Sequence, residues 1–474
     1  MSKQGHECHE GDGHGWGGGP RPGDAGQAAA LKEKVREAIC ARAAEIIGLG
    51  EEVFSHPELG FRETYTAGLM VHCLESLGLQ PETGLALTGV RAVLDTGRPG
   101  PTVAIMGEMD AVVCHQHPAA DRQTGAVHAC GHHAQLAALW GAAVGLTAPA
   151  VREMLCGRVV FWAVPAEEYV EIEYRQRLRE DGRIEFLGGK QELIARGLLA
   201  NVDMCMLCHA ESDNPSRQGK VGGSCNGFIG KLVQYEGREA HAGGAPHQGV
   251  NALNAALLGM MGVHCQRETF RDEDHVRVHH IISRGGDLVN VVPADVRMEM
   301  YVRAANVEAM ADANRKVNRA LRAGGTAVGA RVLIEDLPGY LPMRDHPLLA
   351  DVFGANLGQL IGPENVLPGE HMSGSTDMGD VSHVVPAIHP YLGGFRGRAH
   401  ARDFEVVDRE MAYVIPAQAM AMTVVDLLAG DGDLAERVKE SFRPFDGGPG
   451  AGVARGAAGY VNLWRQLLSE GSGE

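Results

Sequence analysis

The chain has 474 residues, of which 45% are hydrophobic and 22% charged, values typical of a globular protein that is large enough for more than one core. Its 43 Lys and Arg against 60 Asp and Glu give a net charge of −17, which disfavours nucleic acid and anionic membrane surfaces as partners. No run approaches eighteen consecutive apolar residues, and the first thirty residues lack the basic-then-apolar order of a secretion signal, so we expect a cytoplasmic protein. The ten cysteines are scattered, which indicates reduced thiols and metal ligands rather than a disulfide framework.

The first part of the chain contains a low-complexity tail followed by helical segments. Residues 1–26 are rich in glycine and histidine and almost free of aliphatic side chains, which predicts a disordered tail. Residues 27–54 have apolar positions at helical spacing, and a second amphipathic helix is expected at about Glu63–Leu77. The segment SHPELG separates the two.

Three later apolar segments are predicted to be strands that end in acidic or imidazole side chains. PTVAIMGEMDAV ends at Glu108 and Asp110, RVVFWAVPAEEYV at Glu167 and Glu168, and NVDMCMLCHA at His209. Helical segments alternate with these strands, so we expect an α/β domain with a parallel or mixed sheet. Open sheets of this class place their sites beyond the carboxyl ends of the strands, where these side chains would meet.

The stretch HACGHH at 128–133 stands directly before an apolar segment with helical spacing. Thiolate and neutral imidazole suit zinc and neighbouring transition metals, and a helix N-terminus favours the thiolate. The sequence therefore predicts a metal centre at the start of this helix, built on Cys130 and the three histidines beside it. The alternative is a set of buried Cys and His side chains satisfied by packing and hydrogen bonds.

The adjacent acids Glu167 and Glu168 have a specific use in hydrolysis. Neighbouring residues in a strand point to opposite sides, so one carboxylate can bind metal while the other faces the substrate. Glu167 is the candidate general base, acting on a water molecule at an open coordination position. The number of candidate ligands permits a second metal ion about 3.5–4 Å from the first. A solvated strand end is the alternative for these two residues taken alone.

The segment Cys205-Met-Leu-Cys208-His209 matches the C-x-x-C-H haem attachment pattern. We reject that interpretation because the segment has the pattern of a buried strand, in which alternate residues face opposite ways. Covalent haem attachment also usually requires an exported chain, which this one does not resemble. Only His209 is retained as a candidate ligand.

From about residue 219 the pattern changes to strand, helix, two strands, helix, strand, which predicts an inserted α+β domain. His241 lies in a turn-rich stretch of this domain, where it would stabilise an oxyanion if the loop reached the metal cleft. Residues 171–190 look like an insertion over one face of the first domain. The predicted organisation is a tail (1–26), a catalytic domain in two parts (27–218 and 337–474) and the inserted domain (219–336).

A set of motifs in the same order along the chain resembles the amidohydrolase branch of peptidase family M20, which includes auxin-amide hydrolases, aminoacylase-like enzymes and aminobenzoyl-glutamate hydrolases. The resemblance covers about residues 30–430. The motifs that carry it are SHPELGFRETYTA (55–67), GEMDAV (107–112), HACGHH (128–133), PAEE (165–168), LCHA (207–210), REAHAGGAPHQGVNAL (238–253), GGDLVNVVPADV (285–296), STDMGDVSHVVP (375–386) and YLGGFRGRAHARDF (391–404).

This resemblance implies an α/β catalytic domain that binds two divalent metal ions, Mn or Zn, and is interrupted by a ferredoxin-like lid that often dimerises. By motif position it implies Glu167 as the base and Asp110 as a residue that orients a ligand. His241 and Asn290 of the lid would hold the substrate carbonyl, with His241 often supplied by the partner subunit of a homodimer. The implied metal ligands are Cys130, His132, Glu168, His209 and His400.

Three departures from the family pattern concern the substrate and the surroundings of the metals. His133 stands where the family usually has Asp, which either changes the surroundings of the ligands or adds a ligand. STDMGDVS resembles the aminobenzoyl-glutamate and aromatic-amine hydrolases more than the auxin-amide hydrolases. The insertion at 171–190 enlarges the loop that follows PAEE.

We therefore predict a metal-dependent amidohydrolase that cleaves the amide bond of an N-acyl or aryl-acyl amino acid, a small-molecule substrate. The alternatives are hydrolytic deamination of an aromatic amine and dipeptide cleavage. A metal-binding relative without turnover is a third, and the presence of Glu167 disfavours it, because such a relative has no need of a base beside its ligands.

Overall fold

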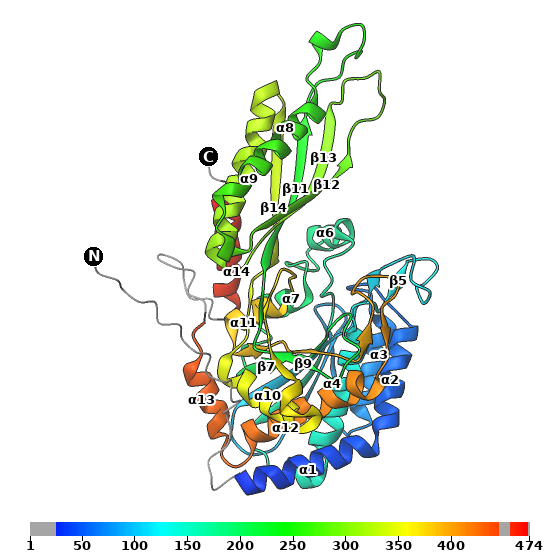
Figure 1. Cartoon of the computed structure of the whole chain (residues 1–474), viewed down its shortest axis with the longest axis vertical. Coiled ribbons are helices and arrows are strands. Elements are labelled where there is room, and N and C mark those ends of the chain that lie inside the picture. Colours follow the sequence, from blue (N-terminus) through cyan, green and yellow to red (C-terminus); the bar gives the residue numbers. More distant parts are fainter. Residues whose placement is uncertain (1–24, 445–455, 473–474) are drawn as a thin grey trace, which may run out of the picture.

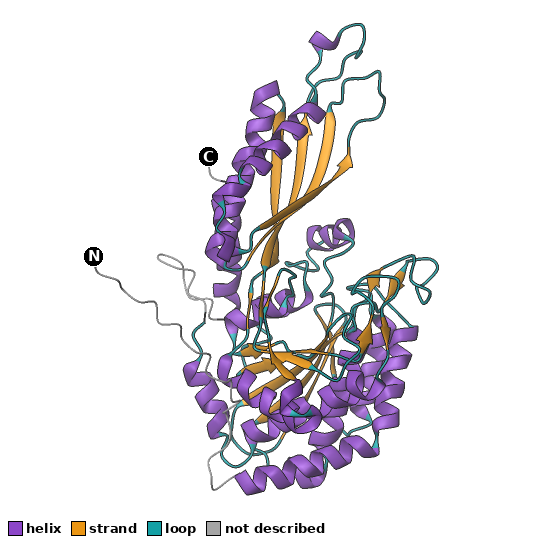
Figure 2. Cartoon of the chain, viewed as in Figure 1, coloured by secondary structure: helices purple, strands orange, loops and turns teal. Residues whose placement is uncertain are grey.

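The computed structural model describes residues 25–444 and 456–472. The chain forms two parts, a large domain whose sheet is covered by helices and a smaller elongated domain that projects from it (Figure 1). Most of the predicted N-terminal tail lies outside the described residues, and residues 25 and 26 begin the first helix. The six-stranded sheet at the centre of the large domain confirms the predicted α/β class (Figure 2).

This central sheet is mixed, with the strand order β1-β2-β6-β3-β7-β18. The pairs of β3 with β6 and β7, and of β7 with β18, are parallel, whereas β1 and β2 run antiparallel at one edge. Every residue of β3 is buried, as expected for a strand covered on both faces. The strands are β1 (Glu82–Leu85), β2 (Gly89–Asp95), β3 (Thr102–Glu108), β6 (Arg158–Val164), β7 (Met204–Met206) and β18 (Ala387–Ile388).

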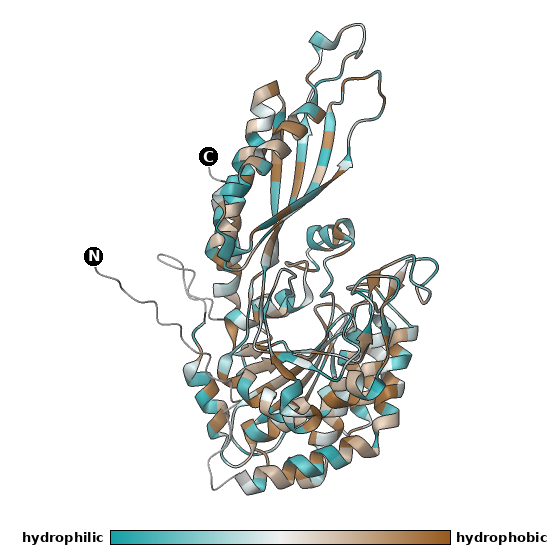
Figure 3. Ribbon diagram, viewed as in Figure 1, coloured by the Kyte–Doolittle hydropathy of each residue, from teal (hydrophilic) through white to brown (hydrophobic). Residues whose placement is uncertain are grey.

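Helices with apolar faces cover the sheet and form one continuous core with it (Figure 3). The helix that follows HACGHH, α4, packs against β3 and is buried over almost its whole length. The helical span Glu410–Leu428 is long and apolar enough to cross a membrane, but its apolar window is entirely buried in this core. The helices are α1 (Ala25–Ala41), α2 (Ala43–Ser55), α3 (Thr64–Glu75), α4 (His132–Thr147), α5 (Pro149–Arg152), α10 (Pro347–Ile361), α12 (Ile415–Leu428) and α13 (Asp433–Ser441), with a π-helical turn (Glu410–Val414) before α12.

The projecting domain, which we call the lid, has the element order β11-α8-β12-β13-α9-β14 that the sequence predicts. Its antiparallel sheet has the order β12-β13-β11-β14, and α8 and α9 cover one face, as in a ferredoxin-like fold. The predicted boundaries of the lid, residues 219 and 336, stay predictions. The first lid strand begins at Gly227 and the last ends at Tyr340, a few residues after these positions. The elements are β11 (Gly227–Glu236), α8 (Ala252–Cys265), β12 (Arg277–Arg284), β13 (Asp295–Ala304), α9 (Val307–Val328) and β14 (Arg331–Tyr340).

Short strands join the two parts of the large domain above the central sheet. The order β16-β9-β19-β8 brings His209, at the start of β8, beside residues far along the chain. The short strands are β4 (Val112–Val113), β5 (Ala126–Val127), β8 (His209–Ala210), β9 (Gly219–Val221), β10 (Ser224–Cys225), β15 (Met343–Arg344), β16 (Val366–Pro368), β17 (His371–Met372), β19 (Tyr391–Leu392), β20 (Phe395–Arg396) and β21 (Glu405–Val406).

Three helices lie at the junction of the lid and the large domain. α7 (Gly189–Ala195) and α11 (Met378–Val384) contact one another, and α14 (Gly456–Ser472) packs on α7, α9 and β14. Within this junction the Asp380 carboxylate accepts hydrogen bonds from Tyr460 Oη at 2.7 Å and Trp464 Nε1 at 3.2 Å. A fourth helix, α6 (Ile172–Glu180), stands beside the open face of the lid sheet (Figure 1).

Candidate active site

The five predicted metal ligands lie together at the carboxyl edge of the central sheet. They form two groups that share Cys130, and the ligand atoms within each group lie within 4.8 Å of one another. Cys130 Sγ is 3.6 Å from His209 Nε2 and 3.3 Å from His400 Nε2. The first group is Cys130, His132 and His209, and the second is Cys130, Glu168 and His400. A shared thiol between two groups is the arrangement expected for two adjacent ions.

The position of Cys130 depends on the glycine that follows it. Gly131 has φ +92°, and a Cβ at this position would lie 2.4 Å from Ala210 Cβ. Only glycine therefore allows the turn before α4 to approach the strand that carries His209. His132 then begins α4 and directs its ring back under the sheet edge, where Nδ1 lies 2.7 Å from the backbone oxygen of Asp110.

The ionisation of these side chains suits metal binding. Burial opposes ionisation of the Cys130 thiol, but the nearby His209 and His132 hold its pKa at about 6. Burial likewise opposes the charge on Glu168, and His400 at 3.0 Å holds the pKa of this carboxyl at about 2. Glu168 in turn raises the pKa of His400 to about 11. A thiolate and a carboxylate therefore face the imidazoles.

The donor set fits divalent metal ions. Two of its buried atoms, His132 Nε2 and Glu168 Oε1, form no well-aligned hydrogen bond within the described part of the chain, although Glu108 Oε2 and His400 Nε2 lie 3.0 Å from them. Buried polar atoms without well-aligned hydrogen bonds are rare, and here they belong to ligand types that bind metal ions. A mixed set of sulfur, nitrogen and carboxylate oxygen suits zinc and its neighbours.

Asp110 lies directly behind the ligands, as the sequence predicts. Its Oδ2 accepts a hydrogen bond from the Glu168 backbone N–H at 2.8 Å, and its Oδ1 lies 3.3 Å from His132 Nδ1. The Asp110 carboxylate thus contacts one residue of each candidate metal group, His132 and Glu168. Asp110 is therefore positioned to orient these two residues.

Glu167, the predicted base, is buried beside the ligands. Its Oε2 lies 3.9 Å from His132 Nε2. Burial raises the pKa of Glu167 well above its ordinary value, and the negative charges of Glu108 and Glu168 raise it further. A carboxyl group with a raised pKa can accept a proton near neutral pH, which is the property a general base needs.

The turn that presents Glu167 is held by residues to which sequence analysis assigned no role. Ala166 has φ +53°, an unusual value for a residue with a side chain, and its N–H donates to Glu63 Oε1 at 2.8 Å. Tyr340 Oη donates a hydrogen bond to the backbone oxygen of Glu167. Glu63 belongs to the quoted segment SHPELGFRETYTA, so the motif contained this signal without showing its purpose.

A second missed feature is a fully buried ionic network behind the site. Lys190 Nζ lies 2.5 Å from both Glu108 Oε1 and Asp377 Oδ1, and the other oxygen of Glu108 lies 3.0 Å from His132 Nε2. These charges have no solvent around them, so they depend on each other for compensation. Glu108 and Asp377 stand in the quoted motifs GEMDAV and STDMGDVS, whereas Lys190 lies at the end of the insertion.

A cavity of about 400 Å³ opens above the ligands toward the lid. Its lid side carries Arg303, whose guanidinium lies 5.1 Å from the Phe228 ring centroid and 5.4 Å from that of Tyr301. Arg303 Nη1 donates to Ser375 Oγ at 2.6 Å, and among the described residues no carboxylate forms an ion pair with it. Sequence analysis missed Arg303, which lies in a strand without a local motif.

His133 and His128 point away from the ligands. Both are buried, and within the described residues none of their four ring nitrogens has a hydrogen-bond partner. The His133 ring packs 5.0 Å from Phe54 and 5.8 Å from Tyr413, and neither histidine belongs to a candidate metal group. Of the two interpretations of His133, the changed surroundings fit this geometry and the added ligand does not.

The two predicted lid residues lie elsewhere. His241 and Asn290 are exposed, and their loops are joined by a hydrogen bond from Ala242 N to the Asn290 oxygen at 2.9 Å. They sit beyond the end of β11 that is remote from the large domain (Figure 1), so a strand of 10 residues separates them from the cavity. At about 3.3 Å per residue that strand spans roughly 30 Å. The structure therefore brings seven of the nine predicted site residues together, and these two are not among them.

The structure also explains why Cys205 and Cys208 do not act together as a haem attachment site. Cys205 and Cys208 are both buried, and they pack into two different clusters, Cys205 with the residues of α7 and α14 and Cys208 with those of α4 and α12. They therefore face opposite sides of the sheet, as the strand pattern predicts.

Comparison with known proteins gives a consistent result. A family model described as "Peptidase family M20/M25/M40" matches residues 104–425. The chain is 30% identical to the Xaa-Arg dipeptidase of Mus musculus (89% of this chain, 96% of that protein) and 30% identical to that of Homo sapiens (90% and 96%). A solved dinuclear metal binding peptidase of Bacillus subtilis shares the fold with a TM-score of 0.64 at 21% identity, covering 85% of this chain and 99% of the other.

Proposed function

The chain belongs to peptidase family M20/M25/M40, and from this we propose that it hydrolyses the amide bond between an acyl or aminoacyl group and an amino acid with a free carboxylate. N-acyl amino acids, aryl-acyl amino acids and dipeptides are the substrates in this class. The general activity, that of a metal-dependent hydrolase acting on C–N bonds, follows from the family and from the candidate metal ligands.

One observation carries the proposal for the substrate: Arg303 stands in the same cavity as Glu167 without a carboxylate partner. Burial lowers the pKa of Arg303, so its charge is incompletely compensated. A guanidinium in this setting binds a carboxylate through paired hydrogen bonds. A substrate carboxylate at Arg303 would hold the adjacent amide near Glu167.

In the proposed reaction Cys130, His132 and His209 would hold one ion, and Cys130, Glu168 and His400 would hold the other. The ions, Mn or Zn, supply Lewis acidity and favour ionisation of a water molecule. Glu167 accepts the proton of the attacking water and returns it to the leaving amine. Asp110 keeps Glu168 and His132 in place, and Lys190 keeps Glu108 ionised behind them.

We propose further that the active form is a homodimer built through the lid. The lid exposes apolar side chains on α8 and on the edge strand β12, such as Met261 (60% exposed) and Ile281 (61%), and large exposed apolar surfaces favour association. Dimerisation would let His241 and Asn290 of one subunit reach the cavity of its partner, where they would hold the substrate carbonyl. A cytoplasmic location remains a proposal, supported only by composition.

A substrate panel tests this function. Purified protein loaded with Mn or Zn is assayed on N-acetyl and N-benzoyl amino acids, dipeptides and aromatic amines, with release of amine or ammonia as the readout. Arg303→Met should raise KM about a hundredfold for carboxylate-bearing amides because a charge-assisted pair is lost, and change kcat little. Arg277→Met, which changes the exposed residue paired with Arg303 across the lid sheet, is the control. Ammonia from an aromatic amine with no activity on any amide would establish the deaminase alternative instead.

A further inference from the structure

The lid is joined to the large domain by two chain segments that run side by side. The first leads from β10 to β11 through Asn226, and the second leads from β14 to β15 through Leu341 and Pro342. β10 and β15 pair with each other, with Cys225 opposite Met343. Two crossings at one place form a hinge, so contacts outside them are needed to set the angle of the lid to the large domain.

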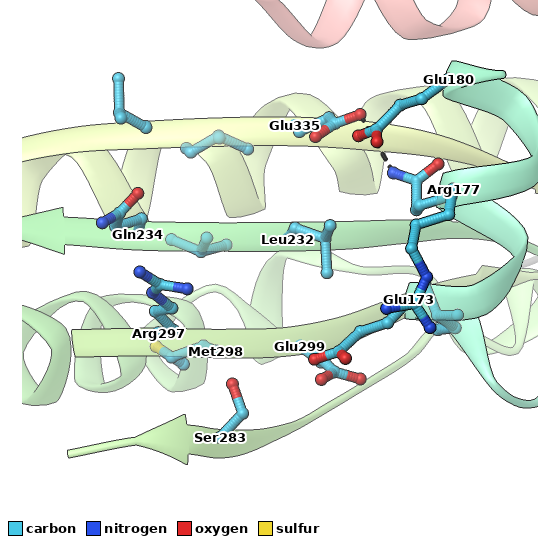
Figure 4. A pocket seen from close by; sticks show the side chains of 15 residues that line it. Glu173, Arg177, Glu180, Leu232, Gln234, Ser283, Arg297, Met298, Glu299 and Glu335 are labelled. Atoms are coloured by element: carbon cyan, nitrogen blue, oxygen red, sulfur yellow. Dashed lines mark hydrogen bonds between the residues drawn. The ribbon is translucent and has the colours of Figure 1, made fainter. Parts of the chain in front are cut away.

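The open face of the lid sheet receives little support. A cleft of about 640 Å³ separates this face from α6 of the large domain (Figure 4). A hydrogen bond from Gln176 Nε2 to Glu335 Oε1 at 3.3 Å crosses the cleft in a solvent-exposed setting. A single exposed hydrogen bond contributes little net stability, because water competes for both partners. α6 therefore constrains the angle of the lid only weakly.

The helical side of the lid is supported by α14 (Figure 1). α14 packs on α9 and β14 of the lid and on α7 of the large domain. Its buried side chains belong to one apolar cluster with Met310 of α9 and Leu193 of α7. These side chains are Tyr460, Val461, Leu463, Trp464 and Leu467. α14 is therefore a third connection between the two parts, made by side-chain packing.

Hydrogen bonds to one buried carboxylate join α14 to the second crossing. Asp380 Oδ1 accepts hydrogen bonds from Tyr460, from Trp464 and, at 3.2 Å, from Gln191 Nε2 of α7. Asp380 Oδ2 accepts a hydrogen bond from the backbone N–H of Leu341 at 3.2 Å. Because Asp380 is fully buried, these donors replace the water that its carboxylate has lost. One carboxylate thus connects α14, α7 and the crossing beside the catalytic cavity.

The end of the lid next to this crossing carries residues that line the catalytic cavity. Arg303 of β13 and Tyr340 of β14 both stand opposite Phe228 of β11. The Tyr340 hydroxyl donates a hydrogen bond to the backbone oxygen of Glu167, and Arg303 Nη1 donates to Ser375 Oγ of the large domain. A change in the angle of the lid would move Arg303 relative to Glu167, although both line one cavity in this structure.

We propose that α14 is a positioning element of the active site, which fixes the lid against the large domain so that Arg303 faces Glu167 across the cavity. Tyr460 and Trp464 are its positioning residues, since they combine apolar burial with hydrogen bonds to Asp380. α14 lies beyond residue 425, where the match to the family model ends. The inference rests on the proposed function, because it assumes that Arg303 binds the substrate carboxylate.

The kinetic test uses the amide of the substrate panel that the metal-loaded protein hydrolyses with the highest kcat/KM. Trp464→Ala should raise KM about tenfold and change kcat less than about threefold, because Arg303 is displaced while Glu167 stays in the large domain. Trp464→Phe keeps most of the packing and should keep KM within about threefold of the wild-type value. Asn462→Ala, on the exposed face of α14, is the matched control. Leu467→Ala, on the buried face, takes the place of Trp464→Ala if that variant does not fold.

A double variant separates positioning from a general loss of stability. If α14 acts through Arg303, Trp464→Ala should change KM less than about twofold in an Arg303→Met background, because the group that α14 positions is already absent. Effects that multiply in the double variant would overturn the proposal. An unchanged KM in Trp464→Ala alone would also overturn it.

Hydrogen exchange of the metal-loaded protein gives a readout without turnover. Backbone amides of the two crossings, residues 222–227 and 337–345, should exchange faster in Trp464→Ala than in Asn462→Ala, because the lid is no longer fixed. Faster exchange supports the role of α14 in fixing the lid even if no amide is hydrolysed, in which case the proposed function alone fails. Equal exchange in the two variants overturns the inference and leaves the proposed function intact.

Discussion

The carboxyl edge of the central sheet and the tip of the lid contain the two parts of the predicted active site, and they differ in how far their side chains are fixed. At the sheet edge, Cys130, Glu168 and Asp110 are held by contacts from several distant segments. At the lid tip, His241 and Asn290 are exposed, and the loops that carry them are hydrogen-bonded to each other. One part of the site is organised by the fold of a single chain, and the other would, in the proposed homodimer, be completed by the partner subunit.

The largest effect is expected from removing the base at the fixed end. Glu167→Gln keeps the shape of the side chain and removes the proton acceptor, so kcat should fall by about 10³–10⁴. Metal content, measured by mass spectrometry of the purified protein, should stay at the wild-type value. The exposed Glu185→Gln is the control. An active Glu167→Gln protein would show that another group accepts the proton.

The next effect concerns the thiol that the two ligand groups share. Cys130→Ser should reduce bound metal and lower activity at limiting metal by about a hundredfold, because a hydroxyl is a far poorer ligand than a thiolate. Cys73→Ser, at a half-buried thiol remote from the site, should leave metal content unchanged. Two retained ions in Cys130→Ser would remove Cys130 from the ligand set.

The stability that the junction of the lid and the large domain contributes should depend on pH. Burial raises the pKa of Asp380 to about 7, above the value expected in the unfolded chain. The folded state therefore binds this proton more tightly, and the resulting stability is present at low pH and lost as pH rises from about 4 to 7. Asp380→Asn lacks this dependence, so its free energy of unfolding should gain on the wild type across that window, by at most about 4 kcal/mol.

Chemical denaturation of both proteins at several pH values measures this difference. The exposed Asp287→Asn should show a constant offset over the same range. A constant offset for Asp380→Asn as well would mean that Asp380 does not carry a raised pKa in the folded protein.

The smallest effect is expected at His133, which neighbours the metal ligands in the sequence but is not part of either candidate metal group. His133 adjoins the ligand His132, but its ring nitrogens are buried without partners among the described residues. His133→Leu removes two unsatisfied polar atoms at similar volume, so the free energy of unfolding should change by about 1 kcal/mol or less. Metal content and activity should stay within about twofold, whereas His132→Leu loses both. Metal loss in His133→Leu would make it a participant in the site.

The fold was largely predictable because strand and helix periodicity extends over long segments, and the lid order follows directly from it. The sheet-edge residues were predictable because each follows a strand, and strand ends meet in a parallel sheet. Arg303, Lys190 and Glu63 were not, since each acquires its role through partners 72 or more residues away in the chain. For Lys190, burial beside Glu108 is set entirely by tertiary packing.

The lid tip shows a different limit of prediction from the sequence. The loop around His241 was identified by its motif, yet its proposed place in the reaction involves a second copy of the chain, which neither periodicity nor the fold of one subunit specifies. That dependence makes the two regions separable by experiment, because each can be damaged in a different copy.

Mixing two inactive variants tests this account most directly. Glu167→Gln and His241→Ala are each purified as inactive proteins, then combined under conditions that exchange subunits. A mixed dimer contains one site with an intact Glu167 from one chain and an intact His241 from the other, so random exchange should restore about a quarter of wild-type activity. No recovery, in a mixture shown by mass spectrometry to contain mixed dimers, would contradict a site completed by the partner subunit.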